Sequence, residues 1–140
     1  MQRQASAEWR GDLKSGKGTL SSDGGALNQT PYSFSSRFEN EKGTNPEELI
    51  AAAHAGCFTM ALSAELGKAN LTPERLRTTA AVSLDKKDGG WSVSESRLDV
   101  VAKIPGASQE AFQKAAEAAK TNCPISKLLN TKITLNARLE

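Results

Sequence analysis

The chain has 140 residues, of which 38% are hydrophobic, and its 18 basic and 16 acidic side chains leave a net charge of +2. That length predicts a single domain over residues 1–140, and the nearly balanced charge disfavours a nucleic acid or an anionic lipid as a partner. The first nine residues lack the apolar stretch of a secretory signal, and no segment has the ~18 uninterrupted apolar residues that usually cross a bilayer. We therefore expect a cytoplasmic protein that does not enter membranes.

Short strands are expected in the first 40 residues, which are rich in glycine and serine with isolated apolar side chains. They are predicted over residues 5–13, 17–22 and 32–39, with turns at Ser15-Gly16 and Asp23-Gly24-Gly25. The third of these strands would carry Arg37 within an aromatic stretch.

A long helix follows, and its start is marked by the order Asn45, Pro46, Glu47, Glu48. Asn45 can cap the helix, proline suits the first helical position, and Glu48 has the spacing of a capping box. The pattern ends at about Leu66, just before a glycine.

The body of this helix has no charged residue from position 49 to position 64, so every face is apolar or small. A helix of this kind must be buried on all sides. One chain of this size has difficulty surrounding it, and its small residues would let another helix approach closely. We predict a two-fold homodimer centred on the helix, and a monomer with the helix beneath its own sheet stays open as the alternative.

The remainder alternates between strands and helices. Residues 76–85 and the segment from Trp91 read as a hairpin, and a change of phase in the apolar alternation predicts a bulge between Ser94 and Arg97. An amphipathic helix is expected over residues 108–120, a short helix after Cys123, and a strand over 133–139. The order of elements predicts an α+β fold.

Cys57 and Cys123 are the only cysteines, and in a reducing compartment they are expected to be free or redox-active. One histidine and no Cys-x-x-Cys pair argue against a metal site. Cys57 lies about 16 Å inside the long helix, where the helix dipole no longer acts and burial raises a thiol pKa. Cys123 begins a new helix, where partial positive charge favours a thiolate.

A thiolate at Cys57 needs a cation, and Arg37 is the best candidate. Glu47 would orient Arg37, while Glu48 would serve in capping. Taken singly, a cysteine is more commonly a small buried hydrophobe, and an arginine such as Arg37 is more commonly an exposed strand residue. His54, three residues before Cys57, leaves a Cys-His nucleophile pair open, although no Asp or Asn is evident to orient the imidazole.

Three stretches of the sequence resemble the OsmC/Ohr family, the osmotically inducible protein C and organic hydroperoxide resistance proteins. They are residues 34–50, the helix from Ala51 to Leu62, and the run Asn122, Cys123, Pro124, Ile125, Ser126. Shorter matches at Trp9 to Asp12, Gly16 to Thr19 and Val82 to Asp85 extend the resemblance over nearly the whole chain. The place of the arginine, just before the helix start, is similar to the OsmC branch.

The resemblance implies an intertwined α+β homodimer in which antiparallel sheets pack around a long buried central helix, with two active sites at the subunit interface. In it Cys57 is the peroxidatic cysteine, Cys123 the resolving cysteine, Arg37 the activating arginine and Glu47 its carboxylate partner. It gives His54 no catalytic role.

The chemistry expected from this set is a thiol peroxidase that needs no haem, flavin or metal. Cys57 would reduce an organic hydroperoxide, and hydrogen peroxide less well, and the sulfenic acid would condense with Cys123 before an external thiol or dithiol restores the enzyme. Lipoyl dithiols have this last role in the Ohr branch.

Four apolar side chains, Phe34, Phe38, Phe58 and Met60, either form an apolar substrate mouth or belong to the core. Two rival functions remain: a non-enzymatic dimer that binds an apolar ligand and has a redox-sensitive disulfide, and a thiol hydrolase that uses Cys57 and His54.

Overall fold

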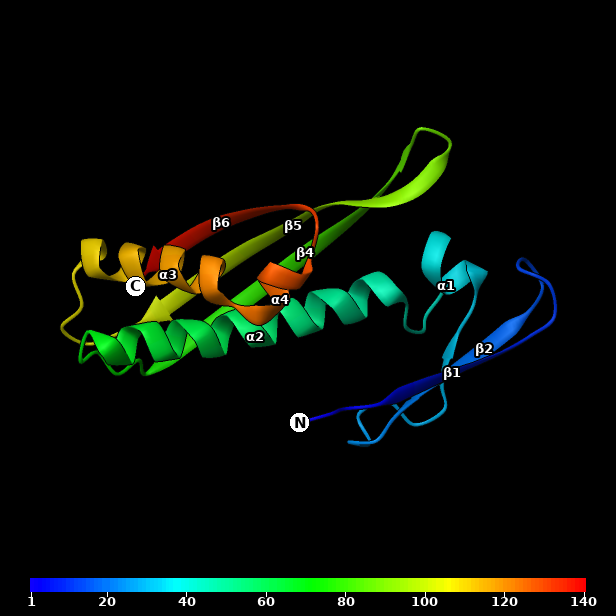
Figure 1. Ribbon diagram of the computed structural model, residues 1–140, viewed down its shortest axis with the longest axis horizontal. Helices are drawn as coiled ribbons and strands as arrows, with labels where there is room; N and C mark the ends of the chain where they lie inside the picture. Colours follow the sequence, from blue (N-terminus) through cyan, green and yellow to red (C-terminus); the bar gives the residue numbers. More distant parts are fainter. The chain divides into compact units, whose positions relative to one another are not determined.

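The computed structural model describes residues 1–140, which form two compact units, Met1–Leu49 and Ile50–Glu140 (Figure 1). Each unit has its own three-stranded sheet, and α2, the long helix, begins at the end of the first unit and continues into the second. The fold is α+β, as expected, and the single domain over 1–140 stays a prediction.

The first unit is an antiparallel sheet in the order β1 (Ala5–Arg10), β2 (Lys17–Ser22), β3 (Thr30–Tyr32). Gly18 on β2 pairs with Trp9 on one side and with Tyr32 on the other, and the two rings lie 5.3 Å apart between centroids. A Cβ atom at Gly18 would collide with both rings. The glycine therefore permits the aromatic contact that joins the outer strands.

The strand expected over residues 32–39 is wrong, because β3 ends at Tyr32 and a short helix, α1 (Phe34–Phe38), follows. Ser33 and Ser36 form a reciprocal capping box: the Ser33 hydroxyl accepts from the Ser36 N–H at 3.1 Å, and the Ser36 hydroxyl accepts from the Ser33 N–H at 2.9 Å. These bonds satisfy backbone N–H groups in the first turn of the helix, which in a strand would need an adjacent strand as partner. Arg37 consequently lies on a helix.

The second unit contains the sheet β4 (Arg75–Lys87), β5 (Gly90–Lys103), β6 (Lys132–Leu139). Ser83 pairs with Glu95 and Leu84 with Val93, so Ser94 has no partner and the expected bulge is confirmed. The expectation of wholly antiparallel sheets is wrong, since β6 runs parallel to β5. The chain makes this return through the helices α3 (Gln109–Asn122) and α4 (Pro124–Leu128), as a parallel connection requires.

The core lies between one face of this sheet and the helices α2 (Pro46–Lys68) and α3, which run along it in Figure 1. Every second residue of β5 points into it, opposite a row of large side chains from α2. The fully buried members are Phe58, Leu62, Leu66, Leu98, Val100, Phe112, Ala116, Ala119 and Cys123.

Helix α2 is buried within the chain on this face alone, so the expectation of burial on every side is not met by one chain. Met60, on the other side of the helix, is 77% exposed. By length and mean hydropathy α2 could also cross a membrane, contrary to the expectation that no segment would. Core helices of soluble proteins meet the same criterion, and α2 places a full row of side chains in a sheet core.

Candidate active site

The two cysteines meet in the second unit although 66 residues separate them in the sequence. Cys57 is half-buried on α2, and Cys123 is fully buried at the junction where α3 ends and α4 begins. Both are free thiols, and the Cys123 Sγ donates to the Cys57 Sγ at 2.8 Å. A disulfide, with a bond of about 2.05 Å, can therefore form with a small approach of the two sulfur atoms.

The environment of Cys57 does not favour its thiolate. Burial raises the pKa of the Cys57 thiol, and the neighbouring Cys123 thiol raises it further. Hydrogen bonding from the backbone N–H of Ile125, in the first turn of α4, acts in the opposite direction and lowers this pKa. No cationic side chain is among the groups that shift it. A thiolate near neutral pH therefore needs a cation from elsewhere.

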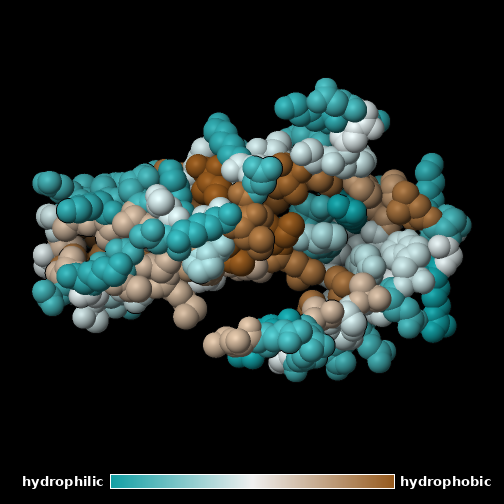
Figure 2. Space-filling model, viewed as in Figure 1, coloured by the Kyte–Doolittle hydropathy of each residue, from teal (hydrophilic) through white to brown (hydrophobic).

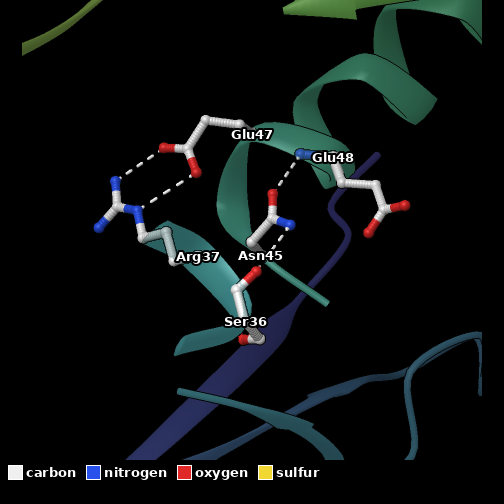
Figure 3. Close-up of polar contacts among 5 residues, drawn as sticks. All are labelled: Ser36, Arg37, Asn45, Glu47 and Glu48. Carbon is white, nitrogen blue, oxygen red and sulfur yellow. Dashed lines mark hydrogen bonds and ion pairs between the residues drawn. The ribbon is translucent and has the colours of Figure 1, made fainter. Parts of the chain in front are cut away.

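Arg37 and Glu47, both in the first unit, form a bidentate ion pair (Figure 3). The Arg37 Nη2 donates to Glu47 Oε1 at 2.7 Å and the Nε donates to Oε2 at 3.2 Å. The Glu47 side chain is only 12% exposed, whereas that of Arg37 is 37% exposed. Two parallel bonds fix the plane of a guanidinium, and here they leave its Nη1 group free to donate to another anion. The expected contact is present.

Glu48 lies beside this pair but takes no part in it. Its backbone N–H donates to the Asn45 Oδ1 at 2.8 Å, so Asn45 caps α2 as expected. The Glu48 carboxylate points away from the cap and makes no hydrogen bond, and the Asn45 amide instead donates to the Ser36 carbonyl at 3.3 Å (Figure 3). The capping box that the spacing predicted is thus only half formed.

His54 is fully buried, and both ring nitrogens have serine partners. The Nδ1 lies 2.7 Å from the Ser96 hydroxyl on β5, and the Nε2 lies 2.8 Å from the Ser126 hydroxyl on α4. Burial lowers the pKa of His54, so the imidazole is neutral at neutral pH. With both nitrogens occupied it has none left to accept the proton of Cys57, and this arrangement does not support the Cys-His hydrolase.

The apolar side chains expected at a substrate mouth separate into two groups. The rings of Phe34 and Phe38 lie 4.9 Å apart between centroids, tilted by 41°, and line a cavity of about 270 Å³ in the first unit, together with Arg37. Phe58 belongs to the core, so its assignment to a surface pocket is wrong, and Met60 is exposed on α2. The remaining lining residues are Trp9, Leu13, Tyr32, Ser33 and Pro46.

Sequence reasoning missed Trp9 and Tyr32 as pocket residues. Both lie on strands next to Gly18, and aromatic side chains flanking a small residue on paired strands were the available signal. It also missed Ser96 and Ser126, since nothing in the sequence connects two serines 30 residues apart with one histidine.

Comparison with known proteins places the chain. The OsmC-like protein family matches residues 39–138. Peroxiredoxin OsmC of Escherichia coli (strain K12) is 50% identical over 138 residues, which are 99% of this chain and 96% of that protein. The chain belongs to the OsmC family. Its resemblance to the OsmC branch is thereby confirmed.

More distant relatives of this OsmC-family protein include organic hydroperoxide resistance proteins. The organic hydroperoxide resistance protein OhrB of Bacillus subtilis (strain 168) is 27% identical over 124 residues, 88% of this chain and 89% of that protein. Its crystal structure aligns with a TM-score of 0.69 over 98% of both chains. An OsmC-like protein of unknown function from Vibrio cholerae, at 20% identity, aligns with a TM-score of 0.78 over 98% of this chain and 99% of that one, and supports the fold alone.

Proposed function

We propose that this protein is a thiol-dependent peroxidase that reduces organic hydroperoxides to alcohols. The single observation that carries the proposal is the contact of Cys57 Sγ and Cys123 Sγ at 2.8 Å. Membership of a family that contains Peroxiredoxin OsmC agrees with it. Cys57 is the attacking sulfur, because it retains some exposure while Cys123 has none.

The reaction has three steps. The Cys57 thiolate attacks the terminal oxygen of the hydroperoxide, the O–O bond breaks, and the alkoxide leaves as an alcohol after taking a proton. Cys123 then attacks the sulfur of the resulting sulfenic acid, which forms the disulfide and releases water. Two external thiols, or one dithiol, reduce the disulfide and return both cysteines to the thiol state.

Arg37 supplies the cation that Cys57 lacks in its own unit, and Glu47 holds the guanidinium for this purpose. The free Nη1 group provides the donors for a sulfur anion and for the peroxide oxygen as negative charge moves from one to the other. This assignment requires the first unit of one chain to meet the second unit of the same chain or of a second copy.

A homodimer would meet that requirement and also cover the exposed side of α2. The second unit exposes a row of small or apolar side chains along this helix, and Figure 2 shows hydrophobic surface gathered over the middle of α2 and over α4. The row consists of Ala52, Ala53, Gly56, Met60, Ala64 and Gly67. Such a surface lets two helices approach closely. A Met60→Glu variant should therefore dissociate in sedimentation, whereas a monomer would tolerate this change at an exposed position.

The cavity of the first unit is the site proposed for the organic part of the substrate. Its aromatic lining would hold an alkyl or aryl group, and Arg37 at its edge would meet the peroxide oxygens. We place the protein in the reducing cytoplasm, where both cysteines can be returned to thiols by a cellular thiol or dithiol.

Peroxide consumption by the purified protein with dihydrolipoamide tests the proposal. Cys57→Ser should abolish turnover, and Cys123→Ser should complete one round of reduction when no thiol is added. After one equivalent of alkyl hydroperoxide, the wild-type chain should lose two hydrogens and yield a peptide linking Cys57 to Cys123. Full turnover by Cys57→Ser would exclude the mechanism, and no consumption by the wild-type protein would favour the ligand-binding dimer.

A further inference from the structure

The segment that carries Cys123 is short and depends on contacts outside itself. Cys123 ends α3 and also precedes α4, which has five residues. Such a helix cannot hold its own position, because short helices are not stable by themselves. The α3 side of Cys123 is fixed by its N–H, which donates to the Ala119 carbonyl at 2.9 Å, so what fixes α4 against α2 fixes the other side of this residue.

Besides the Ile125 N–H at the Cys57 sulfur, two side-chain contacts tie this segment to α2, one on each side of Cys123. Three residues after it, the Ser126 hydroxyl meets the His54 Nε2 at 2.8 Å, and both groups are buried. One residue before it, the Asn122 amide donates to the Glu65 carboxylate at 3.3 Å, in an exposed position. The buried contact is the stronger constraint, because an unpartnered polar group there would cost free energy that an exposed one would recover from water.

The α2 residues in these contacts lie on one side of the helix with Cys57 among them. Cys57 follows His54 by three residues and so is its neighbour on the helix surface. The tie at Ser126 thus acts one turn from the point where the Cys123 Sγ meets the Cys57 Sγ. It also holds the first turn of α4, whose Ile125 N–H is directed to the Cys57 sulfur.

We propose that His54 is a positioning residue for the resolving step: through Ser126 it holds α4 so that Cys123 is already in place when Cys57 becomes a sulfenic acid. This role rests on the proposed peroxidase function and goes beyond it. It assigns the imidazole no proton transfer. Cys123 attacks the sulfenic sulfur, water leaves, and no further oxidant takes part.

The consequence is a competition between two fates of the Cys57 sulfenic acid. A correctly placed Cys123 closes the disulfide, whereas a displaced Cys123 leaves time for a second peroxide to give the sulfinic acid. Misplacement of a reacting group by about 1 Å can slow a step by about 100-fold. The positioning role therefore predicts a change in the products and not only in stability.

A matched pair of variants separates this role from a structural one. Ser126→Ala and Ser96→Ala each remove one hydroxyl partner of His54 and leave one ring nitrogen unsatisfied, but only Ser126 lies on α4. His54→Gln retains a donor and an acceptor and should behave between the wild type and Ser126→Ala.

Single-turnover oxidation by cumene hydroperoxide is followed by quenching and mass analysis of each variant. In Ser126→Ala, the peroxide should oxidise the Cys57 thiol at the wild-type rate, but disulfide formation should slow at least about tenfold. With excess peroxide, the sulfinic acid of Cys57 should therefore accumulate. Ser96→Ala should give wild-type products. Equal behaviour of the two serine variants, or wild-type products from Ser126→Ala, would overturn the proposal.

A second measurement keeps the result independent of peroxidase activity. Diamide converts a thiol pair to a disulfide without peroxide, and the rate of the Cys57–Cys123 link should fall in Ser126→Ala and not in Ser96→Ala. If the wild-type protein consumes no peroxide but this difference is found, the peroxidase function fails and the positioning role stands. If peroxide is consumed and the difference is missing in both measurements, the positioning role fails alone.

Discussion

Replacing Glu47 by glutamine tests the ion pair that is proposed to prepare Arg37. Glutamine keeps the size of the side chain and one acceptor oxygen, but its amide nitrogen would face an N–H of the guanidinium, so one of the bonds at 2.7 and 3.2 Å is lost. A buried hydrogen bond to a charged group contributes about 1.5–3 kcal/mol. Water screens part of this interaction at Arg37, whose side chain is 37% exposed. We therefore expect the variant to lose about 1.4 kcal/mol of stabilisation, which corresponds to a factor of about ten in the thiolate equilibrium.

The assay is kcat/KM for an alkyl hydroperoxide with excess dithiol, measured from pH 7 to pH 9. At pH 7, Glu47→Gln should be about tenfold slower, because less Cys57 is present as thiolate when the guanidinium is poorly held. The deficit should shrink as the pH rises toward the Cys57 pKa of the variant, since alkali then supplies the thiolate without help from Arg37.

Glu48→Gln is the matched control for this change. It alters the net charge and the first turn of α2 in the same way, but the Glu48 carboxylate makes no hydrogen bond in the structure (Figure 3). It should keep the wild-type rate within about twofold. Equal rates for the two variants, or a deficit in Glu47→Gln that does not change with pH, would refute the role of Glu47.

Three further predictions follow from the geometry. Cys123→Ser should make the second and later turnovers depend linearly on external thiol, because it loses a sulfur held at 2.8 Å from Cys57 Sγ, and kinetics that do not depend on thiol would contradict this. Leu62→Ala should lower the free energy of unfolding by about 2–5 kcal/mol in urea titrations, since Leu62 is fully buried. Trp9→Leu should raise KM for cumene hydroperoxide severalfold and leave KM for hydrogen peroxide unchanged, because Trp9 lines the cavity. Trp91→Leu is the control outside the cavity, and equal effects of Trp9→Leu on both peroxides would show that the cavity does not bind the substrate.

The stability of the protein should also fall in mild acid, for a reason that His54 supplies. Burial lowers the pKa of His54, so the unfolded chain, with a pKa near 6.5, binds the proton more readily than the folded chain. Stability that is present above pH 6.5 is therefore lost as the pH falls below it, by up to about 1.4 kcal/mol at pH 5.5. His54→Gln should show less of this loss between pH 7.5 and 5.5 in urea unfolding, and an equal loss would show that another group is responsible.

Much of the fold could be predicted because local chemistry decides it. Asn45 accepts a hydrogen bond from the first turn and Pro46 suits the first helical position, so this pair starts a helix whatever lies around it. The change of apolar phase after Val93 can be accommodated only by an extra residue, which the structure places at Ser94. The α1 helix was missed because Tyr32 and Phe34 alternate with serines as in a strand. The reciprocal bonds of Ser33 and Ser36 and the four-residue spacing of Phe34 and Phe38 favour a helical turn instead.

The candidate site divides in the same way. Arg37 and Glu47 are ten residues apart, close enough for the sequence to predict their contact from charge and helix position. The sequence likewise determined that Cys57 lies deep in an apolar helix, far from any helix-dipole effect, because helical rise and residue polarity are local properties.

Only the tertiary structure decided which side chains meet Cys57 and His54 on that helix. The crossover through α3 and α4 brings Cys123 to Cys57 and Ser126 to His54, and the chain then adds β6 to the sheet, parallel to β5. These contacts span 66 and 72 residues, and no periodicity in the chain records them, since they depend on how a short helix is held over a core built from distant strands.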